Sequence, residues 1–63
     1  MLTHSREIVS RLVKDGFMHR STKGSHHKYA HPDGRIVIVP HPRRDIPQGT
    51  VRSIYRQAGW RAD

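Results

Sequence analysis

Turn-forming residues divide the middle of this chain into segments that are too short for anything except local connections. Gly16, Gly24 and the run His31-Pro32-Asp33-Gly34 separate three strand-like stretches, expected at residues 17–21, 26–30 and 35–39. Glycine accepts positive φ, and proline followed by Asp-Gly is a strong tight-turn signal. Because parallel neighbours need a crossover of a dozen or more residues, the three strands are predicted to form an antiparallel meander.

An amphipathic helical pattern flanks the strands on each side. Near the N-terminus, Ser5 is a candidate cap, Gly16 ends the helix, and the apolar stripe comprises Ile8, Val9, Leu12 and Val13. Toward the C-terminus, Asp45 is a candidate cap, Pro47 suits a first turn, and the apolar stripe comprises Val51, Ile54, Tyr55 and Ala58. Gly59 should end this second helix, with Trp60 folding back against its last turn.

The predicted order is therefore α-β-β-β-α, in a single domain over residues 1–63. Two amphipathic helices on one face of a small sheet make a two-layer α+β fold, whose other sheet face stays open to solvent. A chain of this length buries only about 60% of its unfolded surface, which excludes two-lobed enzymes, Rossmann-type folds and deep enclosed substrate cavities. The chain has no cysteine, so neither a disulfide framework nor a thiolate metal site is expected.

The charge balance points to a polyanionic partner. Twelve Lys and Arg against five Asp and Glu give a net charge of +7, with a pI near 11.2. Nucleic acid is favoured over an anionic membrane surface or an acidic protein. The longest apolar run, Ile36-Val37-Ile38-Val39, is far shorter than the roughly 20 residues of a membrane span. Since the N-terminus also lacks a hydrophobic signal segment, we expect a cytoplasmic protein with no membrane partner.

The most unusual stretch runs from Lys23 to Tyr29 and contains two adjacent histidines. Strand alternation places His26 and Lys28 on the open sheet face, and turns His27 and Tyr29 toward the helices. An accessible imidazole between Lys23 and Lys28 suits a phosphodiester, because lysines attract phosphate and imidazole exchanges protons near neutral pH. The alternative for His26 is an ordinary polar residue at a strand start, and for His27 a partly buried, hydrogen-bonded histidine.

Other charged residues are weaker candidates. Arg43 and Arg44 precede the second helix, whose N-terminus favours an anion, although a solvated loop would explain them equally well. Arg52 and Arg56 lie off the apolar stripe and are expected in solvent. The spacing of the histidines matches no zinc motif, so neither a metal nor another cofactor is expected; the histidines considered are His26, His27, His31 and His41.

Five motifs in order resemble the HicA mRNA interferase family, the toxin half of HicA–HicB toxin–antitoxin pairs. They are Lys23-Gly24-Ser25-His26-His27, His31-Pro32-Asp33-Gly34-Arg35, Val39-Pro40-His41-Pro42, Ile46-Pro47-x-Gly49-Thr50-Val51-Arg52-Ser53-Ile54 and Gln57-Ala58-Gly59. The resemblance spans Ser5 to Trp60. Tyr55 and Trp60 depart from it, since many members carry smaller or aliphatic residues there.

The resemblance implies a fold like that of double-stranded-RNA-binding domains and a ribonuclease that cleaves mRNA. The family's catalytic histidine corresponds to His26, with His27 as the alternative. We expect the RNA contacts to come from Lys23, Gly24, Ser25, Lys28, Arg43 and Arg44. His26 would take a proton from a 2′-hydroxyl in a metal-independent transphosphorylation, and the general acid is open between water, His27 and His41.

The resemblance also implies a HicB-like antitoxin, and DNA would be reached only through that partner. Two other functions compete with the ribonuclease. A non-catalytic RNA-binding module would share the fold and the charge but would not need His26. A DNA-binding domain is disfavoured, because the sequence shows no basic recognition helix with polar base-reading residues.

Overall fold

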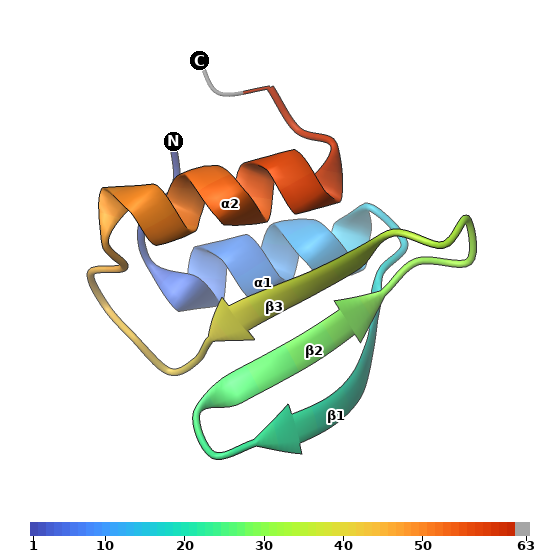
Figure 1. Cartoon of the computed structure of the whole chain (residues 1–63), viewed down its shortest axis with the longest axis horizontal. Coiled ribbons are helices and arrows are strands. Elements are labelled where there is room, and N and C mark those ends of the chain that lie inside the picture. The colour runs from blue at the N-terminus through green and yellow to red at the C-terminus, as the bar shows by residue number, and fades with distance from the viewer. Residues whose placement is uncertain (62–63) are drawn as a thin grey trace.

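The computed structural model describes residues 1–61 and has the predicted order of elements (Figure 1). The five elements are α1 (Ser5–Lys14), β1 (Met18–Lys23), β2 (His26–Ala30), β3 (Ile36–Pro40) and α2 (Gln48–Ala58). The strands lie in the order β1-β2-β3 and both pairs are antiparallel, which confirms the predicted meander and the α+β fold. No helix within residues 1–61 is long and apolar enough to cross a membrane.

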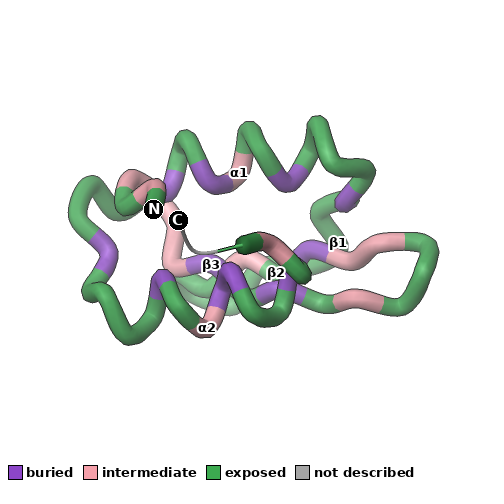
Figure 2. The backbone as a smooth tube through the Cα atoms, turned by 90° about the horizontal axis from the view of Figure 1, so that it is seen from above, coloured by how far each residue is buried: buried purple, intermediate pink, exposed green. Residues whose placement is uncertain are grey.

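The core lies on one face of the sheet. Tyr29 pairs with Val37 across β2 and β3, so these two residues share a face, and Val39 lies on the same face two residues further along. All three are buried against both helices, which contribute Ile8, Leu12, Val51, Ile54, Tyr55 and Ala58. In Figure 2 the buried segments of α1 face the strands and α2. The predicted stripes are therefore confirmed except at Val13, which is 57% exposed because α1 packs through Ile8 and Leu12.

Both helix starts differ from the prediction. His4 caps α1, because its Nδ1 accepts a hydrogen bond from the Arg6 N–H, whereas Ser5 is the first helical residue and is fully buried. The Ser5 hydroxyl instead forms hydrogen bonds with His41 and Arg43 in the loop after β3. Asp45 is not a cap either. The extended backbone at Pro47 delays the start of α2, and no side chain caps that helix.

The strand limits also shift slightly. Phe17 is a core residue that precedes β1, and β1 then continues to Lys23 with a bulge between His19 and Ser21. At the other edge of the sheet, β3 includes Pro40, where a missing N–H is tolerated because the strand ends there. The predicted helix ends are confirmed. Gly16 and Gly59 have positive φ, and the Trp60 N–H donates to the Tyr55 carbonyl oxygen at 2.8 Å.

Candidate nucleic-acid site

The two adjacent histidines of β2 occupy opposite faces of the sheet, as predicted. His26 pairs with Lys23 of β1 and with Pro40 of β3, and its side chain is exposed on the face away from the core. Lys28 is exposed on the same face. His27 shares the core face with Tyr29 and is only half-buried, because it lies toward the side of the sheet that the helices leave uncovered. The structure therefore brings Lys23, His26 and Lys28 to one surface.

His26 lines an open groove with a volume of about 600 Å³, which lies between β3 and α2. Arg43 borders the groove from the loop that follows β3, and α2 contributes the Thr50 and Ser53 hydroxyls and the Gln57 amide. Among the described residues, no carboxylate lines this groove. The groove therefore combines an imidazole, a guanidinium and neutral hydrogen-bonding groups, a set suited to a phosphodiester.

The hairpin between β1 and β2 is joined to the loop that carries Arg43. Gly24 makes the hairpin turn with a φ of +59°, and the neighbouring Ser25 carbonyl oxygen accepts a hydrogen bond of 2.8 Å from the His41 N–H. This bond holds the start of β2 beside residues 41–45. Gly24 and Ser25 thus have a visible structural role at the site. Arg43 lines the His26 groove, whereas Lys23, Lys28 and Arg44 lie outside its lining.

A row of imidazoles lies on the other sheet face, and sequence analysis did not anticipate it. The ring centroids of His19 and His27 are 5.1 Å apart, as are those of His27 and His41. The Ser5 hydroxyl ends the row, 2.7 Å from His41 Nδ1. His19 lies beside His27 because of the bulge between His19 and Ser21. Strand alternation without that bulge would not place it there.

The environment of His41 favours its neutral form. Burial lowers the pKa of His41 below its ordinary value, and electrostatic interactions with His27, Arg6 and His4 lower that pKa further. His31 is not part of this row. Its ring accepts from the Asp33 N–H and donates to the Asp15 carbonyl oxygen, so it serves the turn before β3. Within residues 1–61, no three His, Asp or Glu side chains are arranged to hold a metal ion.

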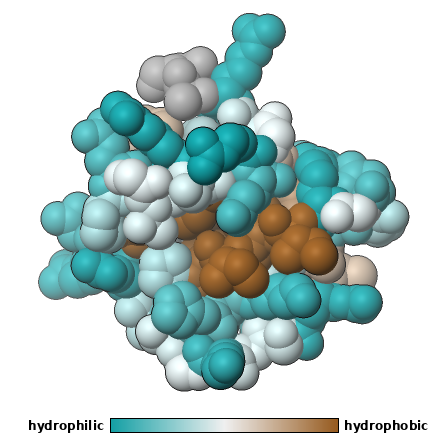
Figure 3. Space-filling model, in the orientation of Figure 1, coloured by the Kyte–Doolittle hydropathy of each residue, from teal (hydrophilic) through white to brown (hydrophobic). Residues whose placement is uncertain are grey.

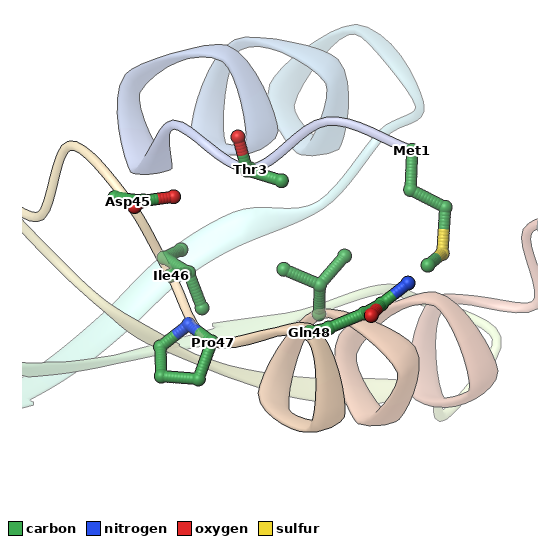
Figure 4. Close-up of a pocket in the computed structure, with 7 residues that line it drawn as sticks. Met1, Thr3, Asp45, Ile46, Pro47 and Gln48 are labelled. Atoms are coloured by element: carbon green, nitrogen blue, oxygen red, sulfur yellow. The ribbon is translucent and has the colours of Figure 1, made fainter.

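A hollow beside the N-terminal segment has a different character (Figure 4). It has a volume of about 500 Å³ and is lined by Met1, Thr3, Asp45, Ile46, Pro47, Gln48 and Val51. The Asp45 carboxylate is the only charged side chain among these lining residues. Its wall is held by a backbone hydrogen bond of 2.9 Å from Ile46 to Thr3.

A family model described as the HicA toxin of bacterial toxin–antitoxin systems matches residues 5–60. The chain belongs to the HicA toxin family. A search of curated proteins finds no significant match.

Membership in the HicA family supports a toxin role and implies an antitoxin partner. The matched segment contains both the His26 groove and the imidazole row of this HicA toxin. Arg52 and Arg56 are exposed on α2, as predicted, and neither lines the groove.

Proposed function

We propose that this HicA-family toxin is an endoribonuclease that cleaves mRNA in the cytoplasm without a metal ion. The observation that carries the proposal is the placement of His26, an exposed imidazole in a groove that it shares with Arg43 and hydroxyl groups of α2. Lys23 stands opposite His26 on β1, and Lys28 follows on the same face. A phosphodiester in this groove would contact Arg43, with Lys23 and Lys28 on the sheet surface beside the groove.

In the proposed reaction, neutral His26 accepts the proton of a ribose 2′-hydroxyl. The 2′-oxygen attacks the adjacent phosphorus, the bond from phosphorus to the 5′-oxygen breaks, and the products are a 2′,3′-cyclic phosphate and a 5′-hydroxyl. General base catalysis of this kind contributes about 10²- to 10⁴-fold. Arg43, Lys23 and Lys28 stabilise the charge that builds on the phosphoryl oxygens.

The leaving 5′-oxygen also needs a proton. Neither His27 nor His41 lines the His26 groove, and His27 lies on the opposite sheet face. We therefore assign the general acid to a water molecule in the open groove. His27 is therefore a stringent control for His26. The two residues share a strand and a side-chain type but lie on opposite sheet faces.

The test compares His26→Ala with His27→Ala in RNA cleavage and in growth arrest after induced expression. We expect His26→Ala to abolish both activities with little change in melting temperature, since the side chain is exposed. His27→Ala should retain cleavage. The opposite result would move the catalytic role to His27, and tight RNA binding without cleavage by the unmodified toxin would indicate a non-catalytic RNA-binding module.

We further propose that a HicB-like antitoxin of acidic character inhibits this toxin by covering the face that carries His26. Ile36, Ile38 and Met18 are large apolar side chains exposed on that face, at 47%, 38% and 61%. Figure 3 shows an apolar patch over the position of β3. An exposed apolar patch with basic residues around it suits an acidic protein partner. Contact with DNA would then come only through the antitoxin.

A further inference from the structure

The start of α1 carries a second basic hollow, which shares only Arg43 with the groove of His26. It has a volume of about 360 Å³ and is lined by His4, Arg6, Pro42, Arg43 and Arg44. We infer that this hollow is a phosphate-binding subsite, which holds a backbone phosphate of the RNA next to the phosphodiester that lies at His26. The inference rests on the proposed ribonuclease function and deepens it by adding a path for the substrate.

The positive charges of this hollow are not neutralised within the described part of the chain. The ion pairs found there are made by Arg35 with Asp15 and Asp33. Over residues 1–61, no carboxylate lies within ion-pair distance of Arg6, Arg43 or Arg44. Three guanidinium groups around one hollow repel one another, and an anion between them relieves that repulsion.

The attraction comes from side chains rather than from free N–H groups of the helix. The first-turn N–H groups of α1 already have acceptors: Arg6 donates to His4 Nδ1, while Glu7 and Ile8 donate to the His4 carbonyl oxygen. With Nδ1 occupied as an acceptor, the ring proton of neutral His4 resides on Nε2, where it is available to a ligand. Guanidinium groups match phosphate with paired hydrogen bonds, so the arginines define the ligand class.

The hollow is held in shape by hydrogen bonds between its two walls. The Ser5 N–H donates to the Arg43 carbonyl oxygen at 2.9 Å, and the Arg43 N–H donates to the Ser5 hydroxyl at 2.8 Å. These bonds fix the loop that carries Arg43 and Arg44 against the start of α1. A fixed set of donors loses little freedom when it binds, which favours a defined subsite.

Arg43 connects this hollow to the proposed active site, because it also lines the groove of His26. A single strand that reaches from one hollow to the other would therefore pass over Arg43. The subsite should contribute only when the RNA has a phosphate beyond the scissile one. Substrate length is thus the variable that tests it.

The test compares cleavage of a ribodinucleotide with cleavage of the same dinucleotide extended by three nucleotides at each end. The wild-type toxin should prefer the extended substrate in kcat/KM. Arg6→Gln should reduce that preference by roughly tenfold, the loss expected for one charge-assisted hydrogen bond to phosphate. Lys14→Gln is the matched control, because it removes one positive charge from the far end of the same helix, outside both hollows, and it should leave the preference unchanged.

A binding measurement separates this inference from the ribonuclease proposal. A fluorescent 2′-O-methyl octanucleotide resists cleavage, and its Kd by anisotropy should rise about tenfold in Arg6→Gln and stay unchanged in Lys14→Gln. If the wild-type toxin binds this probe in that manner but cleaves no RNA, the catalytic proposal fails and the subsite stands. A length preference and a probe affinity that both survive Arg6→Gln would overturn the subsite, as would equal losses in Lys14→Gln.

Discussion

The Ser5 hydroxyl lies 2.7 Å from Nδ1 of His41, a residue 36 positions further along the chain. The same oxygen accepts a hydrogen bond of 2.8 Å from the Arg43 N–H. The Ser5 side chain therefore contacts both the imidazole of His41 and the backbone of Arg43. One buried hydroxyl thereby joins the first turn of α1, the end of the imidazole row and the loop that carries the arginines.

Removing that hydroxyl should destabilise the toxin. Ser5→Ala leaves the Arg43 N–H and the His41 ring without their buried partner, at an expected cost of about 1–3 kcal/mol in the free energy of unfolding. Chemical denaturation measures this change. Ser10→Ala, an exposed serine on the same helix, should cost less than about 0.5 kcal/mol. Equal stabilities for the two variants would show that the Ser5 contacts contribute nothing.

Stability should fall as the pH drops below neutrality, and His41 should contribute to that fall. Its folded-state pKa is lowered by burial, so the unfolded chain takes up the proton more readily. The contribution is fully present above the ordinary histidine pKa of about 6.5 and is lost as the pH falls toward the lowered value. His41→Gln should therefore flatten the dependence of the unfolding free energy on pH between about 5 and 7. An unchanged pH profile in that variant would contradict this account.

The element order and the faces of the β2 residues followed from the sequence, whereas the contacts of the loop after β3 did not. Strand alternation depends only on local geometry, so it placed His26 and Lys28 correctly once the turns were recognised. Ser5 met the local criteria for a cap, but its hydroxyl is used by residues far away in sequence, and His4 takes the capping position. No local pattern encodes that exchange.

The basic hollow was missed for the same physical reason. Arg6 occupies an unremarkable exposed position in a helical pattern, and only the packing of α1 against the 41–45 loop brings it to Arg43 and Arg44. The bulge in β1 likewise pairs His19 with Tyr29 and brings its ring next to His27. Alternation in a regular strand does not predict that contact. Long-range contacts of this kind depend on tertiary structure.

RNA cleavage should continue in excess chelator. The proposed reaction uses the His26 imidazole as its base and the positive side chains around it to stabilise charge, so no step requires a divalent ion. End analysis of the fragments should find a 2′,3′-cyclic phosphate or a 3′-phosphate, with a 5′-hydroxyl on the other fragment. Loss of cleavage on chelation, with recovery on addition of zinc or manganese, would overturn the mechanism.

Affinity for RNA should depend steeply on salt. If about four cations contact phosphates, the slope of log K against log salt is expected near −3 for a single strand. Arg43→Gln should reduce the magnitude of that slope by about 0.7, because Arg43 borders both hollows. Arg52→Gln removes the same charge from α2 outside both hollows and should leave the slope unchanged. Identical slopes for the two variants would mean that Arg43 makes no phosphate contact.

The antitoxin should bury the face that carries His26 and the apolar side chains beside it. In the complex, His26 should become inaccessible to diethylpyrocarbonate, and RNA cleavage should stop.

Because Ile38 is exposed on that face, Ile38→Asp should weaken the complex by at least tenfold, through the loss of apolar contact and the repulsion of an acidic partner. Val13→Asp is the matched control. It places the same charge on an apolar side chain that is exposed on α1, and the affinity for the antitoxin should stay within about twofold. A complex that is insensitive to Ile38→Asp, or one that leaves His26 reactive, would require inhibition from another surface. The toxin would then have to be inactivated through a change in its own conformation.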